Sequence, residues 1–307
     1  SHEGIDFNIY YTTDASSINR VTVNDIDDIQ SYIIESYDGL VDEMGFRSPW
    51  QTILPNYDFV VKDDWWYAEH SHIVLHSGGG PTSENPTNGI RNFNPQEMGV
   101  ITLHELFHNV QRNYMSSVTS AGSGTYIGST WGKLVSEGTA DAMQDKAVAD
   151  FDNESGYPFF DASAENFLSS PEESLFSKSY DGCLWWNYLM EQLGTNKAFE
   201  PYYGSEFMRA FWDQLVADTS TSSANAKATL ESLIESRGRT LESIFHDFVI
   251  CNYTREFDVS GIENEERYYY VDEKDNPLTN VNKTTSAMKG SGSTEINSWA
   301  AHYFEQR

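Results

Sequence analysis

Residues 104–108 of this sequence read His-Glu-Leu-Phe-His, and these residue types at this spacing are suited to binding a metal ion. His104 and His108 are four residues apart, so on a helix both imidazoles leave the same face and can bind one Zn²⁺. Glu105 is rotated by about 100° from His104, and its carboxylate can reach a water on the metal without ligating the metal. The pattern predicts hydrolysis by an activated water with a carboxylate as general base.

The segment that carries these residues has the pattern of an amphipathic helix over residues 97–114. Its apolar stripe, at helical spacing, consists of Val100, Leu103, Phe107 and Val110. Both histidines lie off this stripe. A surface helix with two solvated histidines would have the same pattern, so a third metal ligand has to decide between the two interpretations.

A catalytic zinc site needs three protein ligands and leaves the fourth position for water. In one class of sites the third ligand is a histidine six residues after the second histidine, with a glycine between them. This class is excluded, because Gln111 and Tyr114 occupy those two positions. In the other class the third ligand is a glutamate on a following helix.

Such a helix is predicted over residues 131–147, where Glu137 and Asp141 are four residues apart and share a face. Glu137 can be the third ligand. Asp141 can accept a hydrogen bond from the distal ring nitrogen of a ligating histidine, for which we expect His104. The small residues Gly138 and Ala140 would let this helix approach the first one closely. The alternative interpretation is a charged, solvated helix face.

The elements around the two motifs follow the order strands, helices, then a few strands. Strand patterns run over residues 6–12, 57–62, 72–77, 268–271 and 299–304. A helix with Asn24 as its N-cap and Gly45 at its end follows the first strand. Further helical patterns run over residues 181–193, 205–216, 224–236 and 241–253.

This order predicts an α+β fold, with an N-terminal mixed sheet and an active-site helix followed by a mainly α-helical subdomain. The expected boundaries give an α+β subdomain over residues 1–115, a helical subdomain over 116–260 and a β-rich segment over 261–307. The last segment is either a small appendage or the start of a truncated further domain.

The net charge is −28, from 19 Lys and Arg against 47 Asp and Glu. Such a surface repels nucleic acids and anionic lipids, and no apolar run is long enough to span a membrane. We therefore expect a monomer with no nucleic-acid partner and no membrane span. An acidic surface is typical of a secreted or cell-surface protein, whose signal peptide would already be removed.

Two smaller features leave alternatives open. Cys183 and Cys251 are the only cysteines, and they form either one disulfide or two buried thiols. Asp25, Asp27 and Asp28 could bind Ca²⁺, although carboxylates in the first turn of a helix need no ion to explain them.

The two motifs, H-E-L-F-H-N-V-Q and W-x-x-x-V-S-E-G-T-A-D-A-M-Q-D, resemble those of the gluzincins, the thermolysin-like clan of zinc metallopeptidases. More narrowly, they are similar to those of secreted bacterial and archaeal metallopeptidases with H-E-F-F-H-x-x-Q and a Trp-led helix of the type E-A-T-A-x-W-x-E-D. The resemblance covers residues 5–255 and includes the segments 9–12, 44–47, 180–189 and 248–253. The chain departs from the group at Gly138, Cys183 and Cys251, which take no part in the predicted chemistry.

The resemblance implies a zincin-like fold, in which zinc is held by His104, His108 and Glu137 with Glu105 as the base. It also implies a Tyr or His that donates to the oxyanion of the tetrahedral intermediate. Tyr180 is the candidate, because it opens a helix in a shared segment, and Tyr114 is the alternative. In zincins an edge strand before the active-site helix pairs with the substrate backbone, which implies this role for residues 72–76.

We therefore predict a secreted zinc endopeptidase of a bacterium or archaeon, acting on protein or peptide substrates. One alternative is an exopeptidase, which would need a group to hold a substrate terminus. The other is a catalytically silent zincin-like module for binding or adhesion. The intact Glu105 favours an active enzyme over the silent module.

Overall fold

The computed structural model describes residues 6–14, 21–49, 56–62, 67–68, 72–76, 95–116, 132–147, 158–196, 202–217, 226–254, 270, 298–301 and 303. The chain divides into two compact units. The first comprises Ser1–Ser120 and Met143–Ser155, and the second comprises Ala121–Ala142 and Gly156–Arg307. The division after Ala142 falls inside a helix, so this helix contributes residues to both units.

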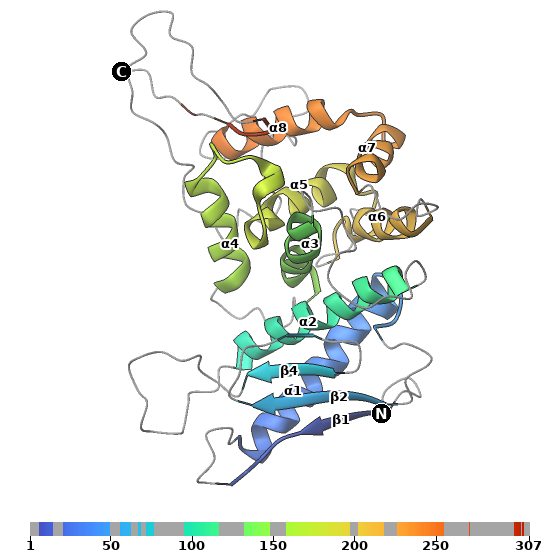
Figure 1. Cartoon of the computed structure of the whole chain (residues 1–307), viewed down its shortest axis with the longest axis vertical. Coiled ribbons are helices and arrows are strands. Elements are labelled where there is room, and N and C mark those ends of the chain that lie inside the picture. The colour runs from blue at the N-terminus through green and yellow to red at the C-terminus, as the bar shows by residue number, and fades with distance from the viewer. Residues whose placement is uncertain are drawn as a thin grey trace, which may run out of the picture. The chain divides into compact units, whose positions relative to one another are not determined.

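The first unit contains a four-stranded sheet. Its strands are β1 (Asp6–Tyr10), β2 (Asn56–Lys62), β3 (Tyr67–Ala68) and β4 (His72–His76). They lie in the order β1-β2-β4-β3. Strands β1, β2 and β4 are parallel (Figure 1), and β3 is antiparallel to β4. Alternate residues of β2, namely Tyr57, Phe59 and Val61, are buried. This is the period of two that the sequence pattern predicts for a half-buried strand.

One expectation about this sheet is wrong. Residues 72–76 form an inner strand, because β4 pairs with β2 on one side and with β3 on the other, at Ile73 and Val74. The edge beside β4 is formed by β3 instead. With only two residues, β3 is too short to have an alternating pattern of its own.

Two helical segments accompany the sheet. The first is α1 (Val23–Tyr37), which continues into the π-helical turn η1 (Asp38–Glu43), and the second is α2 (Pro95–Ser116). In Figure 1, α1 crosses behind the strands. Helix α2 packs against α1, β3 and β4. The predicted apolar stripe of α2 is fully buried at Val100, Leu103, Phe107 and Val110.

The ends of α1 show how local chemistry sets its limits. The N-cap is Thr22 rather than Asn24, because Thr22 and Asp25 bond reciprocally. Thr22 Oγ1 accepts from the Asp25 N–H at 3.2 Å, and the Asp25 carboxylate accepts from the Thr22 N–H at 2.6 Å. This capping box satisfies two backbone donors at once. After η1, Gly45 ends the helical stretch as predicted, with a φ of 73° that favours glycine.

The second unit is helical. Its elements are the first part of α3 (Gly132–Ala147), α4 (Pro158–Ser169), η3 (Leu175–Ser177), η4 (Tyr180–Gly182), α5 (Cys183–Leu193), α6 (Ser205–Ala217), α7 (Ala226–Ser236) and α8 (Leu241–Thr254). The central element is α5, in which every residue except Gln192 is buried. The indole N–H of Trp186 donates to the Leu134 carbonyl at 2.7 Å and ties α5 to α3.

Two parts of this unit differ from the expectations. Helix α4 is missing from the predicted elements, although Pro158 stands at its first position and its buried residues Phe160, Ala164, Phe167 and Leu168 have helical spacing. Residues 299–304 were predicted as a strand, but the structure has a turn at Trp299, whose φ is 60°. Most of residues 261–307, with the pattern at 268–271, lies outside the described residues, so a β-rich segment there stays a prediction.

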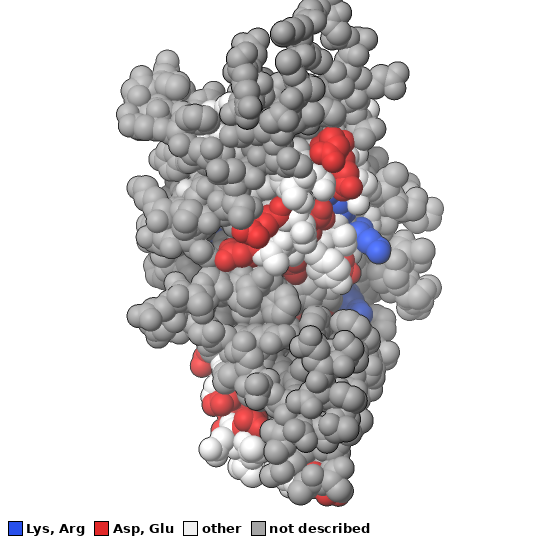
Figure 2. All heavy atoms as spheres, turned by 90° about the vertical axis from the view of Figure 1, so that its left-hand side faces the viewer, with Lys and Arg blue, Asp and Glu red and all other residues white. Residues whose placement is uncertain are grey.

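The α+β class is confirmed, with a small mixed sheet and a predominance of helices. On the face seen in Figure 2, Asp and Glu predominate over Lys and Arg among the described residues, in line with the net charge of −28. Among the described helices, none combines the length and the apolar character that a membrane span requires.

Candidate metal centre

Helix α2 presents the two histidines of the motif from successive turns. Their ring centroids are 4.6 Å apart and the rings are nearly perpendicular, at 87°. His104 is buried and His108 is half-buried. The burial of the apolar stripe fixes the rotation of α2 about its axis. Both imidazoles therefore leave α2 together, on a side that this stripe does not occupy.

A glutamate of α3 completes a group of three. One ligand atom from each of His104, His108 and Glu137 lies within 4.8 Å of the other two. Ligand atoms on one tetrahedral Zn²⁺ are about 3.4 Å apart, so this spacing is on the scale of a single ion. Two imidazole nitrogens and a carboxylate oxygen suit Zn²⁺. The group could hold a metal ion, and within the described part of the chain it is the one such group of His, Cys, Asp and Glu.

The second ring nitrogen of each histidine is next to a glutamine. The His108 Nδ1 lies 2.9 Å from Oε1 of Gln111, three residues later on α2. The His104 Nδ1 lies 3.0 Å from Nε2 of Gln144, near the end of α3. Both glutamines are buried. On each ring, the Nδ1 is thus engaged by the protein itself.

Glu105 lies in a buried polar surrounding on α2, where only 3% of the residue is exposed. Its backbone carbonyl accepts from the side-chain amide of Asn109 at 3.3 Å. Burial raises the pKa of Tyr57 far above its ordinary value, a rise that Arg112 opposes and the charge of Glu105 increases. Tyr57 therefore stays a neutral phenol near the Glu105 carboxylate, and both are shielded from bulk water.

Asp141 is buried on the same side of α3 as Glu137, as its spacing predicts. Its Oδ2 accepts from the Ser163 hydroxyl of α4 at 2.8 Å. The Nδ1 of His104 is next to Gln144, one turn further along α3. The role expected of Asp141 at His104 stays a prediction, and Gln144 is the residue that the structure places there.

The two candidate tyrosines differ in accessibility. Tyr180 is the first residue of η4 and is 50% exposed. Tyr114 is 1% exposed, with the Arg47 guanidinium carbon 4.4 Å above its ring. Only Tyr180 can therefore touch a substrate without a rearrangement of the core, and its role as an oxyanion donor stays a prediction.

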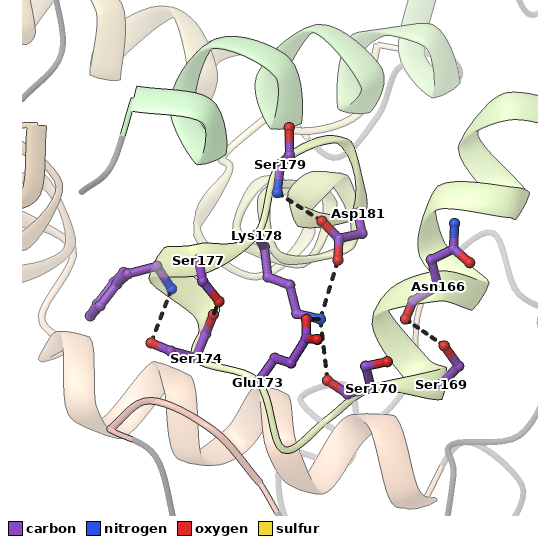
Figure 3. Close-up of polar contacts among 10 residues, drawn as sticks. Asn166, Ser169, Ser170, Glu173, Ser174, Ser177, Lys178, Ser179 and Asp181 are labelled. Carbon is purple, nitrogen blue, oxygen red and sulfur yellow. Dashed lines mark hydrogen bonds and ion pairs between the residues drawn. The ribbon is translucent and has the colours of Figure 1, made fainter. Parts of the chain in front are cut away.

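The segment that carries Tyr180 is held by a buried lysine (Figure 3). The Lys178 cluster consists of its ammonium and three acceptors, namely Glu173 Oε2 at 2.9 Å, Asp181 Oδ2 at 3.2 Å and the Ser170 carbonyl at 3.2 Å. The other carboxylate oxygen of Asp181 accepts from the Ser179 N–H at 2.8 Å. These contacts fix the backbone on both sides of Tyr180.

The same segment packs closely against α3 beside the candidate ligand Glu137. A Cβ at Gly138 would lie 3.1 Å from the Ser179 carbonyl oxygen and 3.2 Å from the Trp186 ring. The close approach that Gly138 permits is thus to the segment next to Tyr180, whereas the sequence suggested an approach to the first motif helix. Gly138, directly after Glu137, therefore lies against Ser179, directly before Tyr180.

The two smaller sequence features are partly resolved. Cys183 and Cys251 are both buried free thiols, so the alternative of a disulfide does not hold. Asp25 serves in the capping box of α1, and among the described residues Asp25, Asp27 and Asp28 do not form a group with metal-binding geometry. The prediction of a Ca²⁺ site gains no support.

Gln111 and Gln144 are the site residues that the sequence reasoning missed. Gln144 follows Glu137 by seven residues, which is two helical turns, so it lies on the same face of α3. Gln111 follows His108 by three residues and faces it on α2. Helical spacing could have drawn attention to both.

No protein-family model matches this sequence, and neither the curated proteins nor the solved structures give a significant match. The function of this chain therefore has to be inferred from the geometry and chemistry of the site itself.

Proposed function

We propose that this chain is a secreted, zinc-dependent endopeptidase of the gluzincin type with a zincin-like fold. The observation that carries the proposal is the group of His104, His108 and Glu137, whose ligand atoms lie within 4.8 Å of one another. Glu105 directly follows one of these ligands, in the position that a general base requires. Two nitrogen donors and one carboxylate leave a fourth position for water or substrate.

Bound Zn²⁺ would supply Lewis acidity toward a substrate carbonyl and make a water more acidic. Glu105 takes a proton from the attacking water and delivers it to the leaving amine. Tyr180 donates a hydrogen bond to the carbonyl oxygen as negative charge develops there. The Lys178 cluster holds the backbone of Tyr180 in place during this step.

An extended peptide is the substrate class that fits the sheet. Within the described strands, β3 is the edge next to β4 and presents a backbone with which a peptide can pair as an added strand. This moves the substrate-pairing role from residues 72–76 to β3.

The first experiment measures metal content and cleavage together. The full chain is loaded with Zn²⁺ and then incubated with an unfolded protein, with and without a chelator. We expect one zinc per chain and cleavage that the chelator abolishes. A chain that binds no Zn²⁺ under these conditions overturns the proposal, and zinc without cleavage favours the silent binding module.

A pair of variants tests the base. Glu105→Gln should keep one zinc and lower the rate by about 10²–10⁴-fold, the usual contribution of a general base. The matched control is Glu235→Gln, at an exposed position of α7, which should retain full activity. A Glu105→Gln chain with an unchanged rate would remove Glu105 from the mechanism.

A peptide blocked at both ends separates the two kinds of peptidase. An endopeptidase cleaves it, because no terminus needs to be held. An exopeptidase cleaves only the unblocked peptide of the same sequence.

A further inference from the structure

Each histidine of the candidate metal centre has its Nδ1 next to a buried glutamine. The distances are 2.9 Å from His108 Nδ1 to Gln111 Oε1 and 3.0 Å from His104 Nδ1 to Gln144 Nε2. Gln111 is 6% exposed and Gln144 is 3% exposed. Because both side chains are buried, breaking either contact would cost a hydrogen bond that bulk water cannot easily replace. All four residues belong to the first unit.

We infer that Gln111 and Gln144 are positioning residues that hold both imidazoles as the Nδ1–H tautomer and thereby direct both Nε2 lone pairs to the metal. The tautomers are a property of the metal-free chain. For His104 the inference rests on the proposed zinc site, because only ligation through Nε2 calls for the proton on Nδ1.

The contact at His108 corresponds to the Nδ1–H tautomer with the Gln111 carboxamide in the orientation that the structure has. A neutral imidazole carries one N–H and one lone pair, and a carboxamide oxygen can only accept. A hydrogen bond between Nδ1 and Gln111 Oε1 therefore requires the proton on Nδ1. The Nε2 of His108 is then the nitrogen with a lone pair for a ligand.

The contact at His104 requires one further step. With Gln144 Nε2 facing Nδ1, the ring proton would sit on Nε2, which could not then ligate. The oxygen and nitrogen of a carboxamide exchange places by rotation about one bond without moving the rest of the side chain. The proposal turns the Gln144 carboxamide in this way, because ligation through Nε2 requires Oε1 toward Nδ1–H. Gln144 then matches Gln111, and His104 offers its Nε2 as His108 does.

The helices explain why these two glutamines can act together with Glu137. Gln144 lies two turns after Glu137 on one face of α3, so a single helix supplies both a ligand and the residue that orients another ligand. Gln111 lies one turn after His108 on α2. Metal sites commonly depend on such hydrogen bonds to the distal nitrogen of a ligating histidine.

The first test reads the tautomers in the metal-free full chain at pH 8. Long-range ¹H–¹⁵N NMR of ¹⁵N-histidine reports which ring nitrogen carries the proton, and His104→Gln and His108→Gln assign the signals. We expect Nδ1–H at both rings. In Gln111→Met, His108 should shift toward Nε2–H, and in Gln144→Met, His104 should do so. Unchanged tautomers in both variants would overturn the inference.

The second test measures Zn²⁺ affinity by competition with a coloured chelator. Gln111→Met and Gln144→Met remove the acceptor at similar length and should weaken binding by about 10–100-fold. Gln111→Glu and Gln144→Glu restore an acceptor and should bind within about threefold of the native chain. The control is Gln214→Met on α6, whose Nε2 donates to Ser232 and whose loss should leave affinity unchanged.

The outcomes separate this inference from the proposed function. Nδ1–H tautomers that depend on the glutamines, in a chain without peptidase activity, support the inference and count against the peptidase. An active zinc peptidase whose Met variants bind Zn²⁺ as tightly as the native chain overturns the inference and leaves the peptidase intact. Glu variants that bind Zn²⁺ as weakly as the Met variants would assign the loss to packing, which also overturns the inference.

Discussion

The Lys178 cluster and the candidate metal centre each contain a buried polar side chain, but they differ in the source of the positive charge. In the Lys178 cluster the chain supplies its own cation, since the Lys178 side chain is 1% exposed and its ammonium meets two carboxylates and a carbonyl. In the candidate metal centre, two imidazoles and the Glu137 carboxylate converge as three electron-pair donors. In the Lys178 cluster the positive charge is part of the polypeptide, whereas the candidate metal centre is suited to an added cation.

This difference separates stability from binding. Removing a buried charge leaves its polar partners without their hydrogen bonds, and this lowers the free energy of unfolding. Removing one ligand from a metal-binding group mainly lowers the affinity of that group for the ion. Substitutions in the two groups should therefore affect different measurements.

The largest expected effect is on folding, in Lys178→Met. The substitution keeps much of the side chain's volume but removes the cation from Asp181, which is 20% exposed. The free energy of unfolding of the metal-free chain should fall by about 3 kcal/mol, measured by urea titration, because the Ser170 carbonyl and Asp181 lose their donor, whereas Glu173 is 57% exposed and stays solvated. A loss below about 1 kcal/mol would mean that water replaces the ammonium at little cost, and the contrast with the metal centre would disappear.

The next effect is on binding, in Glu137→Gln. A lost ligand costs more than the 10–100-fold of an orienting partner, so Zn²⁺ affinity should fall by more than about 100-fold, or about 2.7 kcal/mol. Glu137 is half-buried, so the metal-free chain should unfold within about 0.5 kcal/mol of the native one. Calorimetric titration with Zn²⁺ and urea unfolding give the two numbers. Unchanged affinity would place the third ligand elsewhere.

The sequence predicted the metal centre better than it predicted its support. His104 and His108 follow from helical spacing, because within a helix the position of a side chain depends on a few neighbouring residues. Glu137 lies on another helix, and it was predicted from the resemblance of the second motif to that of the gluzincins. The contact between Gln144 and His104 joins residues 40 apart and depends on how two helices meet. Spacing marks the face of α3 on which Gln144 lies, but not which histidine it meets.

The Lys178 cluster could not be read from the sequence for a different reason. A lysine is usually exposed, and its burial here depends on an irregular stretch between α4 and α5 that has no period to recognise. The same holds for β3, where pairing with β4 rather than residue pattern defines the strand. Of the helices that the sequence did predict, α6, α7 and α8 each bury a periodic apolar face, and α5 is an apolar helix that is buried nearly all round.

The smallest effect comes from a second lysine of the same unit, and it tests whether burial is what makes Lys178 important. Lys227 meets Glu231 at 3.3 Å, with side chains 41% and 37% exposed, and its ammonium lies 5.7 Å from the centre of the Trp299 ring. Water already solvates both charges, so Lys227→Met should cost about 0.5 kcal/mol in urea unfolding and nothing in Zn²⁺ affinity. If this variant lost as much stability as Lys178→Met, carboxylate contact alone would explain both losses. A difference of about 2 kcal/mol between the two lysines would show that the burial of the Lys178 side chain, rather than carboxylate contact alone, carries the effect.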